Sequence, residues 1–346
     1  MDKVVAAAKA IDKTKPASPI ALSYSDELTH IWGKTWGAQS EIGKLREVMV
    51  QRPGPEIAPP PEELKWYGLT GRVDIEKARA EHDNFVEVLR KEGVSVHHMN
   101  TPADARGPYG ILQGLWGTRD FGLVVNGGAV VGRMSLPWDR GAEFWWAKRI
   151  MELGCPILYT VHQNGTFEGG NVVWLGPTHV CIGKSIRTNQ DGIDQISVIL
   201  KSVGVVEIQV VPIPGWLENV EWPAGGFAHL DCVFGYVDSE LALVYPPGVP
   251  FDFLEYLKQR RINMIEVPPV EGRDYACNTL ALEPGKIVML EGCTVTRKRL
   301  EKEGVDVISV GMMEFVKVGG GPHCATAPLI RDPGPILTES PTSRGT

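Results

Sequence analysis

The chain has 346 residues, of which 43% are hydrophobic and 22% charged, a composition typical of a soluble globular protein. Its formal net charge of −7 argues against a nucleic-acid-binding surface. No apolar run approaches the roughly 20 residues that span a bilayer, so we expect neither nucleic acid nor membrane as a partner.

The first residues, MDKVVAAAKAIDKTKPASP, mix acids with lysines and lack the apolar centre of a signal peptide. We expect the first twenty or so to form a loose or helical tail. The six cysteines form no CxxC pair and no regular framework. In a chain without an export signal such cysteines are expected to be reduced, which predicts a cytoplasmic protein.

A strand–strand–helix–strand pattern recurs five times along the chain. In its clearest copy, residues 121–160, the apolar hairpin FGLVVNGGAVVGRM turns at Asn-Gly-Gly, the helical stretch AEFWWAKRIMELG ends at Gly154, and the strand PILYTV follows. Such repetition indicates internal pseudosymmetry in an α/β protein, with an ordinary mixed α/β fold as the alternative. No GxGxxG opens a helix after a strand, which argues against a dinucleotide-binding fold. The other copies cover residues 44–99, 170–213, 230–268 and 276–310.

Polar residues stand at the boundaries between these units. If the units surround a common axis, the boundaries converge there, and each of them supplies an acid, a histidine or a thiol. The motifs are GTRD, TFEGGN, AHLD and GGGPHC, and their residues are Asp120, Glu168, Asn171, His229, Asp231 and Cys324.

The last boundary places Cys324 in a glycine-rich loop, after the run EFVKV (314–318), for which we predict a strand. A cysteine that serves only as a small hydrophobe normally lies inside a regular element. We therefore expect this loop to present the sulfur to a ligand, with an inert buried thiol as the alternative.

These residue types fit one chemistry in particular. A thiol has a pKa near 8.5, and a nearby histidine and a cationic substrate both lower it. His229 is then the general base and acid, and Glu168 holds its ring in one orientation. Two further carboxylates, Asp120 and Asp231, match a planar guanidinium. The set predicts a thiol that attacks the carbon of a guanidinium or amidinium group.

Each residue also has a simpler interpretation. The HxD pattern of His229 and Asp231 occurs in metal sites, although no second histidine cluster lies nearby. Glu168 before Gly-Gly is compatible with the start of a turn, and Asp120 beside Arg119 with a surface ion pair. The joint placement of these residues at unit boundaries favours the catalytic interpretation.

The chain resembles the arginine deiminases and dimethylargininases of the guanidino-group-modifying superfamily. The resemblance covers roughly residues 40–331. It implies a single catalytic domain there, with an N-terminal extension at 1–39 and a C-terminal tail at 332–346. It also implies the five-bladed, pseudo-fivefold α/β propeller called the pentein, built from ββαβ-type units. The matching motifs are SEIGKLREVMVQRPGPE, EHDNFVEVLRKEGVSV, TRDFG, FEGGN, GKSIRTN, HLDCVFGYVD and GGGPHCAT.

The resemblance also implies a role for each motif. In that family the acids of TRD and HxD hold the guanidinium, the acid of EGG supports the histidine, and the cysteine near the C-terminus is the nucleophile. The arginine of SIRTN, Arg187, is expected to bind a substrate carboxylate. Carried over by motif, the first five residues are Asp120, Asp231, Glu168, His229 and Cys324.

Two departures from the family pattern bear on the substrate. Asn171 stands where many relatives have an aspartate, so we expect it to make a different contact near the substrate. The helical insertion of bacterial arginine deiminases is also missing. The roof of the pocket must then come from the Pro-rich stretch 53–70, from 107–117 or from PGWLENVEWPAGG (214–226), and free arginine is not assured as the substrate.

The expected reaction is hydrolysis of a guanidino C–N bond through a covalent S-alkylthiouronium intermediate, giving ammonia or an amine and a ureido product. No metal or organic cofactor is required. An amidinotransferase with an amine as acceptor is the first alternative, and a non-catalytic binding protein on the same propeller is the second. The expected partner is a small guanidino compound, with a homo-oligomer, a dimer by default, as the assembly.

Overall fold

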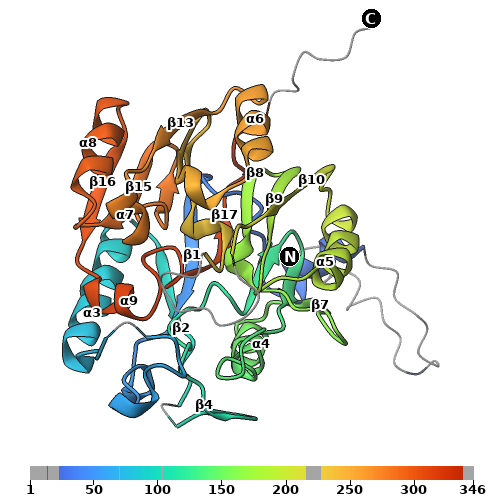
Figure 1. Ribbon diagram of the computed structural model, residues 1–346. Coiled ribbons are helices and arrows are strands. Elements are labelled where there is room, and N and C mark those ends of the chain that lie inside the picture. Colours follow the sequence, from blue (N-terminus) through green and yellow to red (C-terminus); the bar gives the residue numbers. More distant parts are fainter. Residues whose placement is uncertain (1–13, 15–22, 70, 103, 216–226, 338–346) are drawn as a thin grey trace, which may run out of the picture.

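The computed structural model describes residues 14, 23–69, 71–102, 104–215 and 227–337 (Figure 1). Within these ranges no helix combines the length and the hydrophobicity that a membrane span requires. The predicted N-terminal tail lies almost entirely outside the described residues.

Four consecutive units repeat one arrangement (Figure 1). In each, two strands form an antiparallel hairpin, a helix crosses over, and a third strand pairs in parallel with the second strand of the hairpin. This confirms the predicted strand–strand–helix–strand order. The units are β5 (Gly122–Val125), β6 (Gly128–Val131), α4 (Ala142–Glu152) and β7 (Ile157–Thr160); β8 (Val172–Gly176), β9 (His179–Lys184), α5 (Gln190–Ser202) and β10 (Glu207–Pro212); β11 (Phe234–Asp238), β12 (Leu241–Val244), α6 (Phe251–Gln259) and β13 (Asn263–Glu266); and β14 (Leu280–Glu283), β15 (Lys286–Leu290), α8 (Thr294–Lys302) and β16 (Asp306–Val310).

Both ends of the domain build the fifth unit. The last strand, β17 (Ala327–Arg331), pairs antiparallel with β1 (Leu45–Val50), and β1 pairs in parallel with β2 (Ser95–His98) after helix α3 (Ile75–Lys91). Figure 1 shows the blue β1 beside the red β17. The described residues thus form five separate three-stranded mixed sheets and one two-stranded sheet, and none of them closes into a barrel.

Local sequence explains how the units turn. The Asn-Gly-Gly turn joins β5 to β6 as predicted, and Gly154 follows α4 with a φ of +85°, a conformation that glycine adopts without strain. Helix α5 begins at Asn189, whose side-chain oxygen accepts hydrogen bonds from the backbone N–H groups of Gly192 (2.9 Å) and Thr166 (3.0 Å). This cap ties the start of α5 to the loop that leads into Glu168.

The prediction of a strand at 314–318 was wrong, because this segment forms helix α9 (Met313–Lys317). The last sheet ends at β16 and has no further strand beside it, so the backbone of this segment satisfies its hydrogen bonds within a helical turn. Helical spacing buries Glu314 and Phe315, and the Glu314 carboxylate accepts a hydrogen bond from the backbone N–H of Asp74 (3.0 Å).

The remaining elements are short connections. They are α2 (Tyr24–His30), β3 (Arg106–Gly107), β4 (Gly110–Ile111), α7 (Pro269–Arg273) and the 3-10 turns η1 (Pro55–Ile57), η2 (Pro61–Glu63), η3 (Gly169–Asn171), η4 (Leu230–Cys232) and η5 (Pro246–Gly248).

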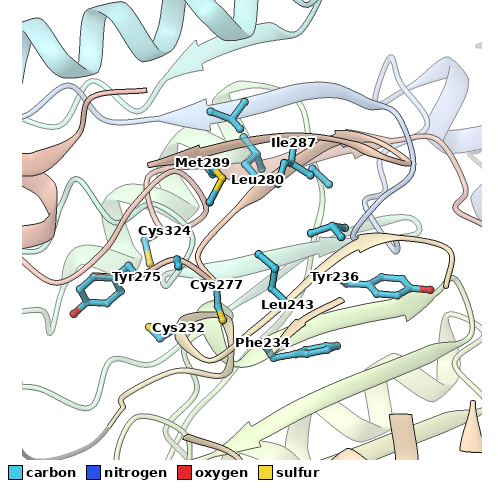
Figure 2. Close-up of a cluster of buried hydrophobic side chains, with 14 of the residues drawn as sticks. Cys232, Phe234, Tyr236, Leu243, Tyr275, Cys277, Leu280, Ile287, Met289 and Cys324 are labelled. Atoms are coloured by element: carbon cyan, nitrogen blue, oxygen red, sulfur yellow. The ribbon is translucent and has the colours of Figure 1, made fainter. Parts of the chain in front are cut away.

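The largest hydrophobic cluster packs the third, fourth and fifth units against one another. Figure 2 shows part of it, including Phe234 and Leu243 of one sheet and Leu280 and Ile287 of the next. Cys324 belongs to the same cluster, so the loop that carries the predicted nucleophile rests on the core. Contrary to expectation, the loop is not exposed, since Cys324 is only 3% accessible to solvent.

Candidate active site

The unit boundaries meet at a pocket of about 330 Å³. Of the residues predicted from the sequence, Asp120, His229, Cys324 and Arg187 line this pocket. The convergence of the boundary residues that the repeats implied is therefore present for these four. The other lining residues are mostly small, apolar or aromatic and include Leu69, Trp116, Phe121, Met134, Leu136, Trp138, Ile186 and Val318.

The backbone around Cys324 is held by an amide that the sequence reasoning missed. Asn278 accepts hydrogen bonds through Oδ1 from the backbone N–H groups of Gly321 (3.1 Å) and Cys324 (3.2 Å). Its Nδ2 donates to the Cys324 sulfur at 3.1 Å. One buried side chain thus shapes the loop and also contacts the sulfur. Because Asn278 lies at the boundary before the fourth hairpin, the boundary argument was able to find it.

The Cys324 thiol is not activated by the free protein alone. A hydrogen bond from the Cys232 thiol lowers the pKa of Cys324, but burial and the charges of Asp231 and Asp120 raise it, and the net pKa lies above the ordinary value. A positive charge in the pocket would offset these carboxylates and favour the thiolate.

His229 lies between two carboxylates. Its Nε2 is 2.8 Å from Oε2 of Glu168, and its Nδ1 is 3.8 Å from Oδ1 of Asp120. Burial alone would lower the pKa of His229, but Asp120 and Glu168 outweigh it and raise the pKa to about 9. The ring is therefore an imidazolium at neutral pH, ready to give up a proton, and the predicted support of His229 by an acid is present in the geometry.

Glu168 and His229 hold equivalent places in consecutive units. Each caps a 3-10 turn that leads into the first strand of a hairpin, Glu168 before η3 and His229 before η4, and both are extended. The pseudosymmetry of the fold therefore brings together the acid and the base that the sequence separates by 61 residues.

Asp120 is the carboxylate best placed to meet a cation in the pocket. Its Oδ1 accepts a hydrogen bond from the backbone N–H of Gly170 at 3.2 Å. Burial raises its pKa to about 6, with contributions from Glu168 and Asp231. A carboxylate this weakly compensated gains stability from a bound guanidinium.

Arg187 does not stand free in the pocket. Its Nη1 lies 3.1 Å from Oε2 of Glu168 and 3.4 Å from Oδ2 of Asp139. The expected contact of Arg187 with a substrate carboxylate stays a prediction, but two protein carboxylates already occupy its guanidinium. Asp139 itself was not foreseen. It lines the pocket, and burial raises its pKa to about 7.

Asp231 lies behind Cys324 and is not among the residues that line the pocket. Its Oδ2 is 2.7 Å from Nδ1 of His323 and 3.7 Å from the Cys324 sulfur. The other ring nitrogen of His323 lies 2.7 Å from Oε1 of Glu41, so the imidazole bridges two buried carboxylates. The predicted contact between Asp231 and the guanidinium stays a prediction, while its ion pair with His323 is a feature that the sequence reasoning missed.

Asn171 is fully buried and occupied by protein groups. Its Oδ1 accepts the backbone N–H of Leu230 at 3.0 Å, and its Nδ2 donates to Thr188 Oγ1 at 3.0 Å and Ser185 Oγ at 3.2 Å. These bonds join the η3 turn to the η4 turn and to the loop that carries Arg187. Its predicted contact with the substrate stays a prediction.

The metal interpretation of HxD finds a poor donor set. Ligand atoms of His229, Asp231 and Cys232 lie within 4.8 Å of one another, as do those of Asp120, Glu168 and His229. However, Nε2 of His229 is bound to Glu168, and Glu168 also holds the cationic Arg187. A metal ion requires a deprotonated imidazole, which the raised pKa of His229 opposes.

Two of the three stretches suggested for the roof contribute to the pocket. Tyr67, Gly68 and Leu69 come from the Pro-rich stretch 53–70, and four residues including Trp116 come from 107–117. In the third stretch, 214–226, all but the first two residues lie outside the described residues.

A family model described as arginine deiminase matches residues 114–249 and 252–331. A 2-nitroimidazole nitrohydrolase from Mycobacterium sp. (strain JS330) is 28% identical, over 94% of this chain and 87% of that protein. An arginine deiminase from Rhodococcus opacus (strain B4) is 25% identical, over 86% of this chain and 98% of that protein.

Solved structures share the fold. A mutant dimethylarginine dimethylaminohydrolase from Pseudomonas aeruginosa, complexed with citrulline, superimposes with a TM-score of 0.65 at 23% identity, covering 82% of this chain and 99% of that one. SxtG, an amidinotransferase from Microseira wollei, gives a TM-score of 0.69 at 18% identity, covering 88% and 99%.

The fold and the site define an enzyme of the guanidino-group-modifying superfamily, as the sequence motifs predicted. The family match covers more than half of the chain, and the chain belongs to the arginine deiminase family. It is thus a hydrolase of the class that acts on non-peptide C–N bonds in amidines.

Proposed function

We propose that this protein is a cysteine-dependent hydrolase that cleaves a C–N bond of a guanidine or amidine through a covalent S-alkylthiouronium intermediate. The observation that carries the proposal is the presence of Cys324, His229 and Asp120 in the wall of one pocket. We also propose that the five sheets are the blades of a pentein propeller around this pocket, which the repeated strand order supports.

The first half-reaction begins when a guanidinium binds beside Asp120. Its positive charge offsets the carboxylates that raise the pKa of Cys324, so the thiol loses its proton. The thiolate attacks the guanidinium carbon and forms a C–S bond. His229 then donates a proton to the leaving nitrogen, the C–N bond breaks, and ammonia or an amine departs.

The second half-reaction regenerates the enzyme. His229, now neutral, takes a proton from a water molecule, and the resulting hydroxide attacks the thiouronium carbon. The C–S bond breaks, Cys324 leaves as the thiolate, and the ureido product departs. Glu168 keeps the His229 ring in one orientation through both steps, at 2.8 Å from Nε2.

The similarity to a 2-nitroimidazole nitrohydrolase supports a second kind of substrate for the same site. In 2-nitroimidazole the carbon that bears the nitro group lies between two nitrogens, as the carbon of a guanidine does. Attack by the same thiolate would expel nitrite in place of ammonia. The chemistry of Cys324 is unchanged in this version, and only the leaving group differs.

The test is intact-mass spectrometry of protein that is mixed with guanidines, amidines and 2-nitroimidazole and then quenched in acid. The wild type and Cys155→Ala are expected to show an adduct that Cys324→Ala lacks. Cys155 is the matched control, because it is a buried thiol that does not line the pocket. An adduct that survives in Cys324→Ala would refute the proposal.

Product analysis separates hydrolysis from transfer. Ammonia, amine or nitrite that appears together with a ureido product in water alone supports the hydrolase. Turnover that requires an added amine acceptor would favour the amidinotransferase. A Cys324 that forms no adduct and stays inert toward a thiol reagent at neutral pH would support the non-catalytic alternative.

The predicted cytoplasmic location belongs to the same proposal. All six cysteines are free thiols in the structure, which is the state expected in a reducing compartment. The predicted homo-oligomer also stays a prediction.

A further inference from the structure

The ion pairs of Arg187 bear on what the far end of the substrate can carry. Arg187 contributes 17% of its side-chain surface to solvent and contacts both Glu168 and Asp139, which are 1% and 12% exposed. A substrate carboxylate that approached this guanidinium would have to displace one of these two acids. The displaced acid would then remain in a nearly dry site without a partner, which is costly.

The pocket offers no second cation in its place. Among the described residues that line it, Arg187 is the only lysine or arginine, whereas Asp120 and Asp139 are both present. Lys65 and Arg140 flank lining segments in sequence, but neither lines the pocket. A bound carboxylate would therefore face acids rather than a partner.

The wall between these charged groups is apolar and aromatic. Trp138 lines the pocket and packs edge-on against Tyr67, with ring centroids 6.0 Å apart, and against Trp66 at 5.9 Å. Leu69 and Leu136 belong to the same two segments and also line the pocket. Such a wall binds a hydrocarbon or aromatic body through the surface it removes from water.

We infer, given the hydrolase proposed above, that the substrate is a small guanidine or amidine with an apolar or aromatic body and no carboxylate. The reacting cation lies beside Asp120 and Cys324, and the body lies against Trp138, Leu69 and Leu136. The volume of about 330 Å³ is at the small end of ligand pockets and suits such a compound.

The test compares two isosteric compounds, pentylguanidine and 5-guanidinopentanoate, which differ only in a methyl group or a carboxylate at the far end. Arginine and 2-phenylethylguanidine complete the panel, and kcat/KM is measured for each. Pentylguanidine is expected to exceed 5-guanidinopentanoate by about a hundredfold, because the carboxylate loses its water without gaining a partner. Phenylethylguanidine is expected to exceed arginine.

Asp139→Asn probes the origin of the preference. This change leaves Glu168 as the only anion that holds Arg187, so the ratio between the two compounds is expected to fall about tenfold. The control is Asp83→Asn, which removes an equally short ion pair with Arg52 on the surface and should leave the ratio unchanged. Should Asp139→Asn fail to fold, the ratio in the wild type decides alone.

The outcomes separate this inference from the proposed function. Adduct formation at Cys324 with arginine or 5-guanidinopentanoate turned over as well as the alkylguanidine would overturn the inference and leave the hydrolase intact. An absence of any adduct and any turnover across the panel would overturn the hydrolase, and the inference with it.

Discussion

The imidazole of His323 joins two buried carboxylates directly beside the proposed nucleophile. Both ring nitrogens lie 2.7 Å from a carboxylate oxygen, one from Asp231 and the other from Glu41. A carboxylate only accepts hydrogen bonds, so both nitrogens carry a hydrogen and the ring is cationic. Burial and Arg119 lower the pKa of His323, but Glu41 and Asp231 outweigh them, and the net pKa is raised.

His323→Ala should therefore destabilise the fold strongly. The side chains of His323, Asp231 and Glu41 are 3%, 2% and 4% exposed, so the change leaves two carboxylates in a dry site. Loss of one partner from a buried ion pair costs about 3–5 kcal/mol. His97→Ala is the matched control: its pair with Glu47 is as short, at 2.8 Å, but the two side chains are 25% and 16% exposed. Its cost should stay below about 1 kcal/mol.

The assay is urea unfolding of the wild type and both variants across pH. Since the folded pKa of His323 lies above 6.5, its contribution is complete below pH 6.5 and is lost as the pH rises through the folded pKa. Since the pKa of Glu41 is lowered from 4.5 to about 2, its contribution is complete above 4.5 and is lost as the pH falls toward 2. The difference between the wild type and His323→Ala should be largest between these limits. A difference no greater than that of His97→Ala would refute the reasoning.

Three further substitutions test the site. Glu168→Gln removes a charge that raises the pKa of His229 to about 9, so the basic limb of the pH profile of kcat/KM should move to lower pH, with kcat about a hundredfold lower. Gly320→Ala places a Cβ 2.9 Å from the Cys324 sulfur, so steady-state kinetics should show a loss of kcat much larger than the loss of stability in urea. Asn278→Ala leaves two buried N–H groups without an acceptor, and urea unfolding should show a cost of about 2 kcal/mol.

The parts of the site that follow from local pattern were predictable. Turn residues and alternating apolar runs mark the hairpins, and the segments before them lie at one end of their sheets. This is why Asp120, His229 and Cys324 meet in one pocket. The equivalent positions of Glu168 and His229 before their turns make their contact a consequence of the repeat.

Other features depend on contacts that no local pattern encodes. His323 and Glu41 lie 282 residues apart, and their contact depends on the pairing of β17 with β1. Arg187 was expected to face a substrate, and its pairing with Asp139 depends on how the loops of two units meet. The run 314–318 has the composition of a strand but meets no free sheet edge, and tertiary context decides its structure.

The charges around the pocket explain why a cation completes the site. Glu168 is bound by both Arg187 and His229, and its pKa falls to about 2. Asp120 and Asp139 have to share these same two cations with it, and burial leaves their pKa values raised, at about 6 and 7. The free pocket therefore holds more negative charge than its own cations neutralise, in a place where water cannot compensate. Binding of a planar cation corrects this imbalance, and the same charge lowers the pKa of the thiol that attacks it.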